Sequence, residues 1–347
     1  MIGIRADAND FVATGHIMRC ITIANELKKS GEEVLFITAD NDADKLLDDA
    51  GMKHIALHTD YREMESELEI LCEQLQVRGI DTLLVDSYYV TYDYFKALNR
   101  VVATAYIDDN HDITVPVDLL INYSGYVYRF DYANDYASMS GKKGGTKLLL
   151  GLKYAPLRPQ FYETTASGGS GKDILLCVGG GDYHDAVIGI LMEADARNVT
   201  DNYNWNVVIG NFVQSEDRIR AFADNHRTVT VHKAVTNMAE LMSKCDAAIT
   251  AAGTMLTECA AMKLPSVFFQ VADNQRYGVD YWADGRQIFA GDIGVNREHT
   301  IKKAVSEVIS LMDDRERLDS MRNKLSLITD GKGAARIAEE LTLLKRK

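Results

Sequence analysis

The sequence predicts an α/β protein of two doubly wound, Rossmann-like domains that face each other across a cleft. Short runs of Val, Ile and Leu recur along the chain, and a longer amphipathic segment follows each of them, as in β-α-β units. The length of 347 residues suits two domains, and a Gly/Ser-rich stretch divides the two sets of runs. We therefore expect an N-terminal domain over 1–163, a linker over 164–172 and a C-terminal domain over 173–347.

Apolar runs in the first half predict strands at Ile2–Ile4, Val34–Ile37, Thr82–Val85, Val101–Ile107, Leu119–Ile121 and Leu148–Leu150. Between them, apolar residues at helical spacing predict helices at Ile17–Lys29 and Met64–Val77. The second half repeats the pattern, with strands expected at Ile174–Val178, Trp205–Ile209, Val229–Val231, Ala247–Thr250 and Val267–Phe269. Beyond residue 297 we expect only helices, at Ile301–Met312, Arg315–Leu325 and Ala334–Leu344. In such folds ligands bind at the carboxyl ends of the strands.

The charge of the chain disfavours two classes of partner. The 38 Lys+Arg residues against 51 Asp+Glu residues leave a net charge of −13, whereas binders of nucleic acid or anionic membranes need a basic surplus. The N-terminus lacks the basic and apolar regions of a signal peptide, and no apolar run approaches the roughly 18 residues of a membrane span. The five widely spaced cysteines favour reduced thiols. We expect a cytoplasmic protein without stable membrane insertion, and leave its oligomeric state open.

The first candidate site follows the first strand, where Arg5 and Asp7 precede Gly15 and His16 at the start of the first long helix. At the mouth of a sheet, the imidazole of His16 can accept a proton near neutral pH, which makes it a candidate general base. The alternative is a structural role, in which His16 caps the helix and Gly15 permits a tight turn. Spacing alone leaves both interpretations open.

Two small-residue turns in the second half are candidates for binding a phosphate group at a helix N-terminus. The first contains Gly180 and Gly181, and its alternative interpretation is a tight structural turn. The second contains Gly253 and leads into a helix for which Thr254 is the expected N-cap. Glu258 lies one helical turn further, where a carboxylate can accept hydrogen bonds from both hydroxyls of a ribose. Its alternative role is to complement the helix dipole.

Several motifs, in the same order over roughly residues 1–280, together resemble the UDP-sugar hydrolases of the pseudaminic acid pathway, which are proteins of GT-B type. The motifs are Gly15–Cys20, Val85–Tyr88, Ile107–Asp109, Leu120–Asn122, Tyr154–Phe161, Gly179–Asp182 and Ala272–Gln275. The segment from Thr250 to Gln275 also resembles the nucleotide-sugar binding signature of GT-B glycosyltransferases. The hydrolase family removes UDP from UDP-2,4-diacetamido-2,4,6-trideoxy-β-L-altropyranose.

The resemblance implies that His16 is the catalytic base, activating a water that attacks the anomeric carbon with inversion, and that neither a metal nor a cofactor takes part. It assigns the sugar to the N-terminal domain, through Arg5, Asp7, Gly15, Asp86, Tyr88 and Asn122. It assigns UDP to the C-terminal domain, through Gly180, Gly181, Gly253, Thr254, Glu258, Asn274 and Gln275.

Two other functions are compatible with the sequence. In a GT-B glycosyltransferase with a UDP-sugar donor, His16 would deprotonate an acceptor hydroxyl instead of water. We see no basic or apolar membrane-facing patch for a lipid-linked acceptor in the N-terminal half, which favours hydrolysis. A nucleotide-sugar binding protein without chemistry could retain Glu258, but the presence of His16 in its motif argues against this class.

Overall fold

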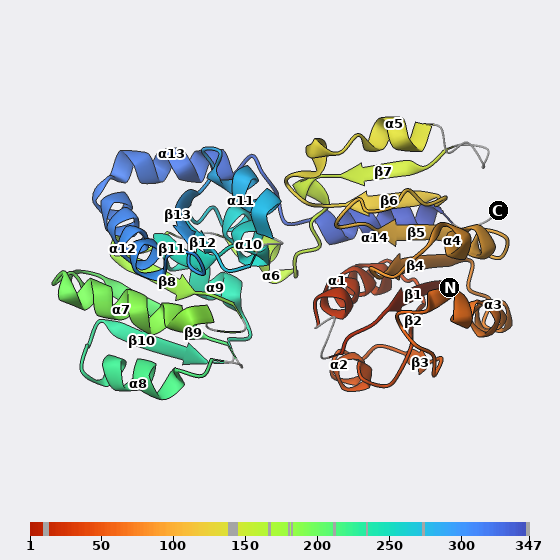
Figure 1. The fold of residues 1–347 in the computed structure, drawn as a ribbon, viewed down its shortest axis with the longest axis horizontal. Coiled ribbons are helices and arrows are strands. Elements are labelled where there is room, and N and C mark those ends of the chain that lie inside the picture. The colour runs from red at the N-terminus through yellow and green to blue at the C-terminus, as the bar shows by residue number, and fades with distance from the viewer. Residues whose placement is uncertain are drawn as a thin grey trace. The chain divides into compact units, whose positions relative to one another are not determined.

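The computed structural model describes residues 1–9, 14–137, 145–165, 168–179, 181, 183–210, 213–233, 235–272 and 275–344. The chain divides into two compact units, the first formed by Met1–Arg158 with Lys332–Lys347 and the second by Pro159–Gly331 (Figure 1). Each unit is built on one sheet whose paired strands are all parallel, which confirms the predicted fold class.

The sheet of the first unit has seven strands in the order β3-β2-β1-β4-β5-β6-β7. The strands are β1 (Ile2–Ala6), β2 (Val34–Thr38), β3 (His54–Ala56), β4 (Thr82–Asp86), β5 (Ala103–Ile107), β6 (Leu119–Asn122) and β7 (Lys147–Leu150). The main helices of this unit are α1 (Gly15–Lys29), α2 (Asp44–Asp49), α3 (Leu68–Val77), α4 (Tyr92–Leu98), α5 (Tyr132–Ala137) and α14 (Gly333–Leu343).

Helices cover both faces of this sheet because successive strand residues point to opposite sides. Val85 of β4 lies in one apolar cluster with Leu71 of α3 and Phe95 of α4. Its neighbour Leu84 lies in a second cluster, together with Ile17 of α1. Strands β1, β2, β4 and β5 are buried along their whole length, as expected for parallel strands that are covered on both faces.

The sheet of the second unit has six strands in the order β10-β9-β8-β11-β12-β13. Its strands are β8 (Asp173–Cys177), β9 (Asn204–Ile209), β10 (Val229–Lys233), β11 (Ala247–Ala251), β12 (Ser266–Gln270) and β13 (Ile288–Asp292). The helices of this unit are α6 (Gln160–Glu163), α7 (Ala186–Ala196), α8 (Glu216–Asp224), α9 (Met238–Ser243), α10 (Thr254–Ala261), α11 (Arg276–Ala283), α12 (Arg297–Asp313) and α13 (Arg315–Leu325).

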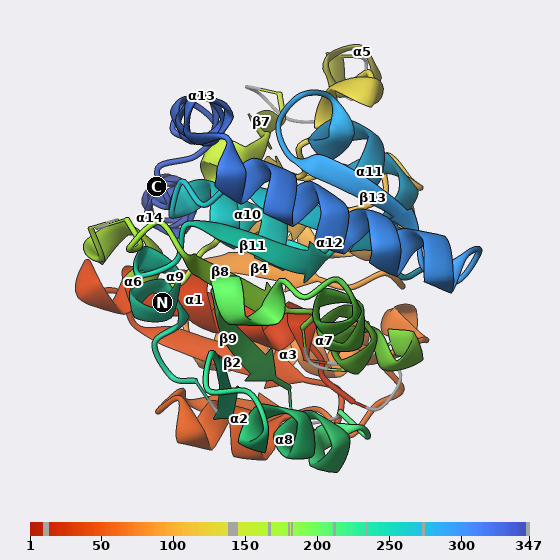
Figure 2. The same cartoon turned by 90° about the vertical axis from the view of Figure 1, so that its left-hand side faces the viewer.

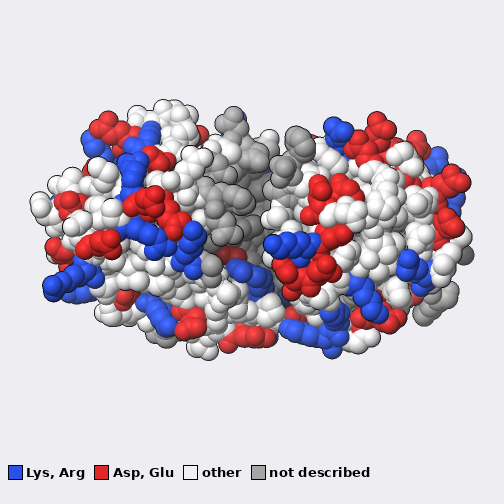
Figure 3. Space-filling view, turned by 90° about the horizontal axis from the view of Figure 1, so that it is seen from below, with Lys and Arg blue, Asp and Glu red and all other residues white. Residues whose placement is uncertain are grey.

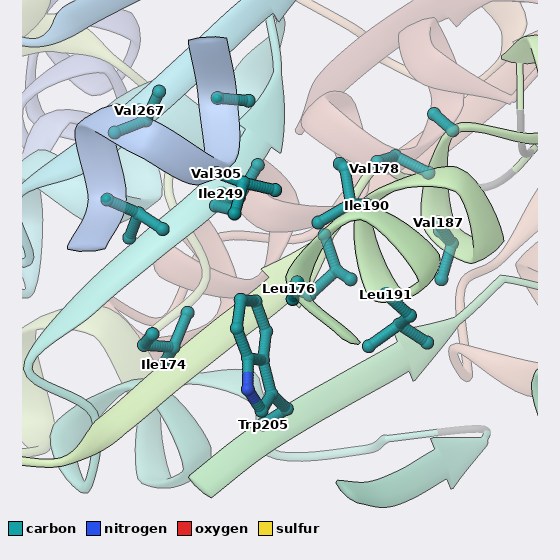
Figure 4. Packing of buried hydrophobic residues seen from close by; sticks show 14 of the residues in the cluster. Ile174, Leu176, Val178, Val187, Ile190, Leu191, Trp205, Ile249, Val267 and Val305 are labelled. Carbon is teal, nitrogen blue, oxygen red and sulfur yellow. The ribbon is translucent and has the colours of Figure 1, made fainter. Parts of the chain in front are cut away.

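One core cluster of the second unit lies between its sheet and helices α7 and α12. The long helix α12 packs along β11, β12 and β13 (Figure 2). In Figure 4, Trp205 of β9 lies below Leu176 of β8, with Leu191 of α7 and Val305 of α12 in the same cluster. The Trp205 side chain is fully buried, and burial of an aromatic ring of this size makes a large contribution to the hydrophobic stability of a core.

The last helix departs from the expected domain division. We expected all the terminal helices in the C-terminal domain, whereas α14 packs against α1 of the first unit. The physical reason is its apolar stripe, since Ala334, Ile337 and Leu341 are buried in the same cluster as the β1 side chains. The units also meet in the chain at residues 158/159 and 331/332, not within the Gly/Ser-rich stretch.

Four elements differ from the sequence prediction in detail. The expected helix over Met64–Val77 is a short 3-10 helix, Met64–Glu67, followed by α3, and the buried Glu67 lies where the two join. Two strands were not predicted: β3 has only three residues, and Gly291 and Asp292 interrupt the apolar pattern of β13. The helix expected to start at Ile301 begins four residues earlier, where the Asn296 side chain accepts a hydrogen bond from the backbone N–H of His299.

Within the described part of the chain, none of the helices combines the length and the apolar character needed to cross a bilayer. On the face of the molecule shown in Figure 3, acidic and basic side chains are interspersed on both units. Interspersed charges of both signs are typical of a solvated surface.

Candidate active site

The centre of the candidate site in the first unit is a contact between His16 and Asp86. His16 lies in the first turn of α1, and Asp86 is the last residue of β4, where it is paired in register with Ala6 of β1. The sheet therefore delivers Asp86 at its carboxyl edge, and α1 begins beside that edge. His16 Nδ1 lies 2.5 Å from Asp86 Oδ1, and both side chains are buried.

Arg19 is one helical turn after His16 and therefore lies on the same face of α1. Its Nε and Nη2 donate to Asp86 Oδ2 and Oδ1, each at 2.5 Å, in a two-pronged contact. Its Nη1 donates to both oxygens of Asp109, at 2.9 and 2.8 Å, and to the Tyr123 hydroxyl at 2.6 Å. One guanidinium thus holds two carboxylates from the ends of adjacent strands.

The charge of Arg19 decides the ionisation of Asp86. Burial alone would raise the pKa of this carboxyl, but the attraction and hydrogen bonds of Arg19, with a smaller contribution from His16, hold it well below its usual range. Asp86 is therefore a carboxylate and can only accept hydrogen bonds. The 2.5 Å contact then requires the proton of His16 to reside on Nδ1, which leaves the lone pair on Nε2.

This arrangement gives His16 the orientation of a general base. In His–carboxylate pairs the carboxylate fixes the tautomer and stabilises the imidazolium that forms when the other ring nitrogen takes a proton. Among the described residues, no hydrogen bond to Nε2 is found. The pair can therefore accept a proton from a hydroxyl group or a water molecule presented to Nε2.

Tyr88 connects this pair to the exposed surface. Its ring meets that of His16 edge-on, with centroids 4.6 Å apart and an interplanar angle of 79°. Its hydroxyl donates to Asp109 Oδ2 at 3.1 Å. The Tyr88 side chain is 54% exposed, so it is the predicted sugar contact that the structure places both beside His16 and in reach of solvent.

Arg5 and Asp7, which were predicted sugar contacts, are used inside the fold. The fully buried Arg5 donates from Nε and Nη2 to the two oxygens of Glu67, at 2.8 and 2.7 Å, and from Nη1 to Asp7 at 2.5 Å. Asp7 also accepts from the backbone N–H of Ala39 at 2.7 Å. Burial disfavours the charge of Arg5, but Asp7 and Glu67 outweigh it and raise the pKa of the guanidinium. These groups brace the end of β1 and are not presented to a ligand.

Asn122 and Gly15 were also predicted sugar contacts, and the structure places them in different surroundings. The Asn122 amide donates to the Tyr132 hydroxyl at 2.8 Å and accepts from the backbone and hydroxyl of Ser124 at 2.9 and 2.7 Å, so this buried side chain shapes the turn after β6. Gly15 is exposed at the first position of α1, and none of the described atoms lies within 4 Å of where a Cβ would stand. In the described part of the chain, space for a ligand therefore exists beside Gly15 but not beside Asn122.

In the second unit, β11 leads through Ala252 and Gly253 into α10. The predicted N-cap was wrong by one residue, since Gly253 is the cap and Thr254 is the first helical residue. The backbone of Gly253 is extended, with φ 172°, and a glycine has no side chain to cap the first N–H groups of the helix. The first N–H groups of α10 consequently point out of an exposed turn formed by Gly253 and Thr254.

Glu258 lies one turn into α10 and is partly exposed. Burial raises the pKa of the Cys177 thiol to about 11, and the negative charge of Glu258 adds to this rise. Glu258 therefore lies close to the end of β8, where the glycine-rich turn with Gly179, at φ 98°, begins. The two small-residue turns predicted from the sequence thus lie on neighbouring strands, β8 and β11, with this carboxylate near both.

The other predicted nucleotide contacts are only partly described. Gly181 is half-buried in the turn after β8, and the Gln275 side chain accepts from the backbone N–H of Val271 at 3.0 Å, after β12. Gly180 and Asn274 lie outside the described residues. Glu258, Gly253 and Thr254 are therefore the best placed of the predicted nucleotide contacts.

Sequence reasoning assigned no role to Arg19, Asp109, Tyr123 or Glu67. The spacing of Arg19 three residues after His16 on an amphipathic helix could have indicated it, as could the position of Asp109 directly after an apolar strand run. Glu67 had no such signal, because a buried glutamate in a helical turn is recognised only when its partner Arg5 is known.

Comparison with known proteins shows the fold class. No family model matches the chain. An uncharacterized protein of Methanocaldococcus jannaschii is 24% identical over 288 residues, which are 79% of this chain and 56% of that protein. The chain thus spans little more than half the length of that relative.

Solved structures resemble the chain over nearly its whole length. MurG of Acinetobacter baumannii has a TM-score of 0.67 at 14% identity, with 99% of each chain covered. The calicheamicin glycosyltransferase CalG4 has a TM-score of 0.62 at 15% identity, covering 99% of this chain and 98% of that one. The spinosyn rhamnosyltransferase SpnG complexed with thymidine diphosphate has a TM-score of 0.61 at 11% identity, covering 98% and 99%. The chain therefore has the GT-B fold.

Proposed function

We propose that this protein is a UDP-sugar hydrolase in which His16 activates the attacking water. The contact between His16 Nδ1 and the ionised Asp86 carries this proposal, because it leaves Nε2 as a base at the carboxyl edge of the sheet. The exposed neighbour Tyr88 and the open surface at Gly15 supply room for the sugar.

In the proposed step, the oxygen of water forms a bond to the anomeric carbon as the bond from that carbon to the β-phosphate oxygen breaks. The electron pair of the broken bond leaves with UDP, and the water proton passes to His16 Nε2. Attack from the side opposite UDP inverts the anomeric centre. UDP is a good leaving group, so one base and preorganised donors for the diphosphate suffice, and the proposal invokes no metal or cofactor.

The second unit would bind the nucleotide through α10. Its N-terminal N–H groups suit a diphosphate, and the partly exposed Glu258, one turn along the helix, would accept hydrogen bonds from the ribose hydroxyls. The motif resemblance points to UDP-2,4-diacetamido-2,4,6-trideoxy-β-L-altropyranose as the substrate, and hence to nonulosonic (pseudaminic) acid biosynthesis.

A GT-B glycosyltransferase with a UDP-sugar donor is the second candidate. The structural likeness to MurG, CalG4 and SpnG supports it, since CalG4 is a glycosyltransferase and SpnG is a rhamnosyltransferase. In this case His16 Nε2 would take the proton of an acceptor hydroxyl. The base and the nucleotide contacts would be the same, and only the nucleophile would differ.

An assay without acceptor separates the two. The protein is incubated with the UDP-linked diacetamido-trideoxyhexose in buffer, and free UDP and free sugar are followed together. A hydrolase releases both in equal amounts over many turnovers, and His16→Gln abolishes the release. UDP release that appears only when an acceptor is added would replace the hydrolase by the transferase.

His54→Gln is a matched control for that assay. His54 also faces a carboxylate, with Nε2 3.3 Å from Asp44 Oδ1, but it begins β3 and so lies at the amino edge of the sheet. Turnover in this variant should equal that of the unmodified protein.

A further inference from the structure

The second unit contains a cavity of about 650 Å³ at the edge of its sheet opposite the candidate nucleotide site. The segments that line it precede strands: Gly168 before β8, Ser243 before β11, and Lys263 before β12. The proposed nucleotide contacts follow strands, at the carboxyl edge. Its volume is in the range of pockets that hold small molecules.

The lining combines cations, hydroxyl groups and apolar side chains. The cations are Lys263, Arg315 and Arg322, the hydroxyl groups belong to Tyr162, Thr164, Thr165, Ser243, Ser326 and Thr329, and the apolar side chains include Phe161, Met242, Met262 and Leu264. One carboxylate, Asp330, also lines the cavity. Such a lining suits a molecule with an apolar body and an anionic group.

The three cations are not equally committed. Arg322 pairs with Asp246 at 3.2 Å and with Asp319 at 3.1 Å, and Arg315 lies 3.5 Å from Asp319. Among the described residues, no ion pair or hydrogen bond engages the ammonium group of Lys263, which is exposed. Lys263 is thus the cation of this cavity that is available to an anion.

The backbone of Lys263 gives an independent reason to single it out. It follows the last turn of α10 at φ 53°, in the left-handed region that favours glycine. Its N–H donates to Ala260 O at 3.0 Å and that of Leu264 donates to Cys259 O at 2.8 Å, which is the Schellman motif that ends many helices.

Other helices of this protein end in the same motif with a residue suited to it. Gly31, Gly51 and Gly79 hold the left-handed position after α1, α2 and α3, and Asn198 holds it after α7. A lysine there strains the backbone without improving the helix end. Its side chain, at the cavity, is what distinguishes this position from the other four.

We propose that this cavity binds a small organic phosphate, with Lys263 Nζ as the principal contact of the phosphate group. The hydroxyl groups of Thr164, Thr165 and Thr329 would donate to the remaining phosphate oxygens, whereas those of Ser243 and Ser326 already donate to backbone carbonyls. The apolar side chains would cover the organic part. The inference does not depend on the proposed hydrolysis, because no residue of this cavity takes part in it.

Binding of phenyl phosphate, measured by calorimetry on the full chain with an excess of UDP present, tests the inference. Inorganic phosphate and phenol are the comparison probes. We expect phenyl phosphate to bind more tightly than either, and Lys263→Gly and Lys263→Met each to weaken it by about tenfold or more, the loss expected for a charge-assisted hydrogen bond.

Thermal unfolding supplies the second readout. Lys263→Gly should raise the Tm by on the order of 2 °C, because glycine relieves the strain of the left-handed backbone conformation. The same variant should bind phenyl phosphate more weakly. Asn198→Gly is the matched control, with a smaller rise in Tm and unchanged affinity. Absence of binding, displacement of phenyl phosphate by UDP, or undiminished affinity in both Lys263 variants would overturn the proposal.

Discussion

The two units share their strand order but differ at the carboxyl edges of their sheets. In each sheet, the first strand of the unit lies third from one edge, between the second and the fourth strands of that unit. The edge of the first unit carries charged side chains that bind one another, namely His16, Arg19, Asp86 and Asp109. The edge of the second carries small residues around Gly253, with Glu258 partly exposed.

Under the proposed function, the two edges would serve two tasks with one topology. Proton transfer needs a side chain held in one orientation and one tautomer, which a network of buried charges provides. A diphosphate needs backbone N–H groups that it can approach closely, which small residues and a helix N-terminus provide without basic side chains. A protein with a net charge of −13 can therefore still bind a dianion.

Among substitutions that test this difference between the two units, His16→Gln should have the largest effect. His16→Gln keeps a polar group of similar size but removes the base, so we expect kcat to fall by about 10²–10⁴-fold with little change in KM. Steady-state release of UDP measures both constants. A lower kcat/KM with an unchanged kcat would assign His16 to substrate binding.

Arg19→Gln should have the next largest effect. It leaves the Asp86 carboxylate buried without its cation, so we expect the free energy of unfolding to fall by about 3–5 kcal/mol. Urea denaturation measures the change. The control, Arg197→Gln, breaks the partly exposed pair with Glu193 and should change stability by less than about 1 kcal/mol. Equal losses in both variants would refute the role given to Arg19.

The acid side of the stability profile tests the same network. The folded-state pKa of Asp86 lies below its unfolded value of about 3.9, so its contribution is complete above that pH and disappears as the pH falls through the folded value. The stability difference between the unmodified protein and Asp86→Asn should therefore narrow below about pH 4. Chemical denaturation at several pH values measures it, with Asp93→Asn, at an exposed aspartate, as the control. A difference that stays constant down to pH 2 would contradict the ionised state of Asp86.

Substitution in the second unit should affect binding and spare stability. Glu258→Gln removes the charge that we propose accepts hydrogen bonds from the ribose, so we expect the Kd for UDP to rise by about tenfold. Calorimetry with UDP measures it. Glu298→Gln, in the first turn of α12, is the control that should leave the Kd unchanged. An unchanged Kd in Glu258→Gln would remove this residue from the nucleotide site.

Gly253→Ala should have the smallest effect. Because φ is 172° and none of the described atoms lies within 4 Å of an added Cβ, the free energy of unfolding should stay within about 0.5 kcal/mol. The Kd for UDP should rise a few-fold, since the methyl group stands where the diphosphate approaches the backbone. Stability lost without loss of affinity would show that Gly253 serves only the turn.

The fold was predictable because buried parallel strands appear as continuous apolar runs, as in Val34–Thr38 and Ala247–Ala251. The His16–Asp86 pair was partly predictable, since Asp86 directly follows an expected strand and His16 lies at the start of an expected helix. The internal roles of Arg5 and Asn122 were not, because a polar residue at a strand end looks the same whether its partner is a ligand or a distant side chain such as Glu67. The place of α14 depends on packing between residues more than 300 positions apart in sequence, such as Ile4 and Ile337, and local pattern carries no sign of it.

The central claim is that His16 directs water to the anomeric carbon of a UDP-sugar. Turnover of UDP-2,4-diacetamido-2,4,6-trideoxy-β-L-altropyranose in heavy-oxygen water, followed by mass spectrometry of both products, tests it most directly. We expect one heavy oxygen in the free sugar, none in UDP, and loss of labelled sugar in His16→Gln. Heavy oxygen in UDP would mean attack at phosphorus and would refute the role proposed for His16.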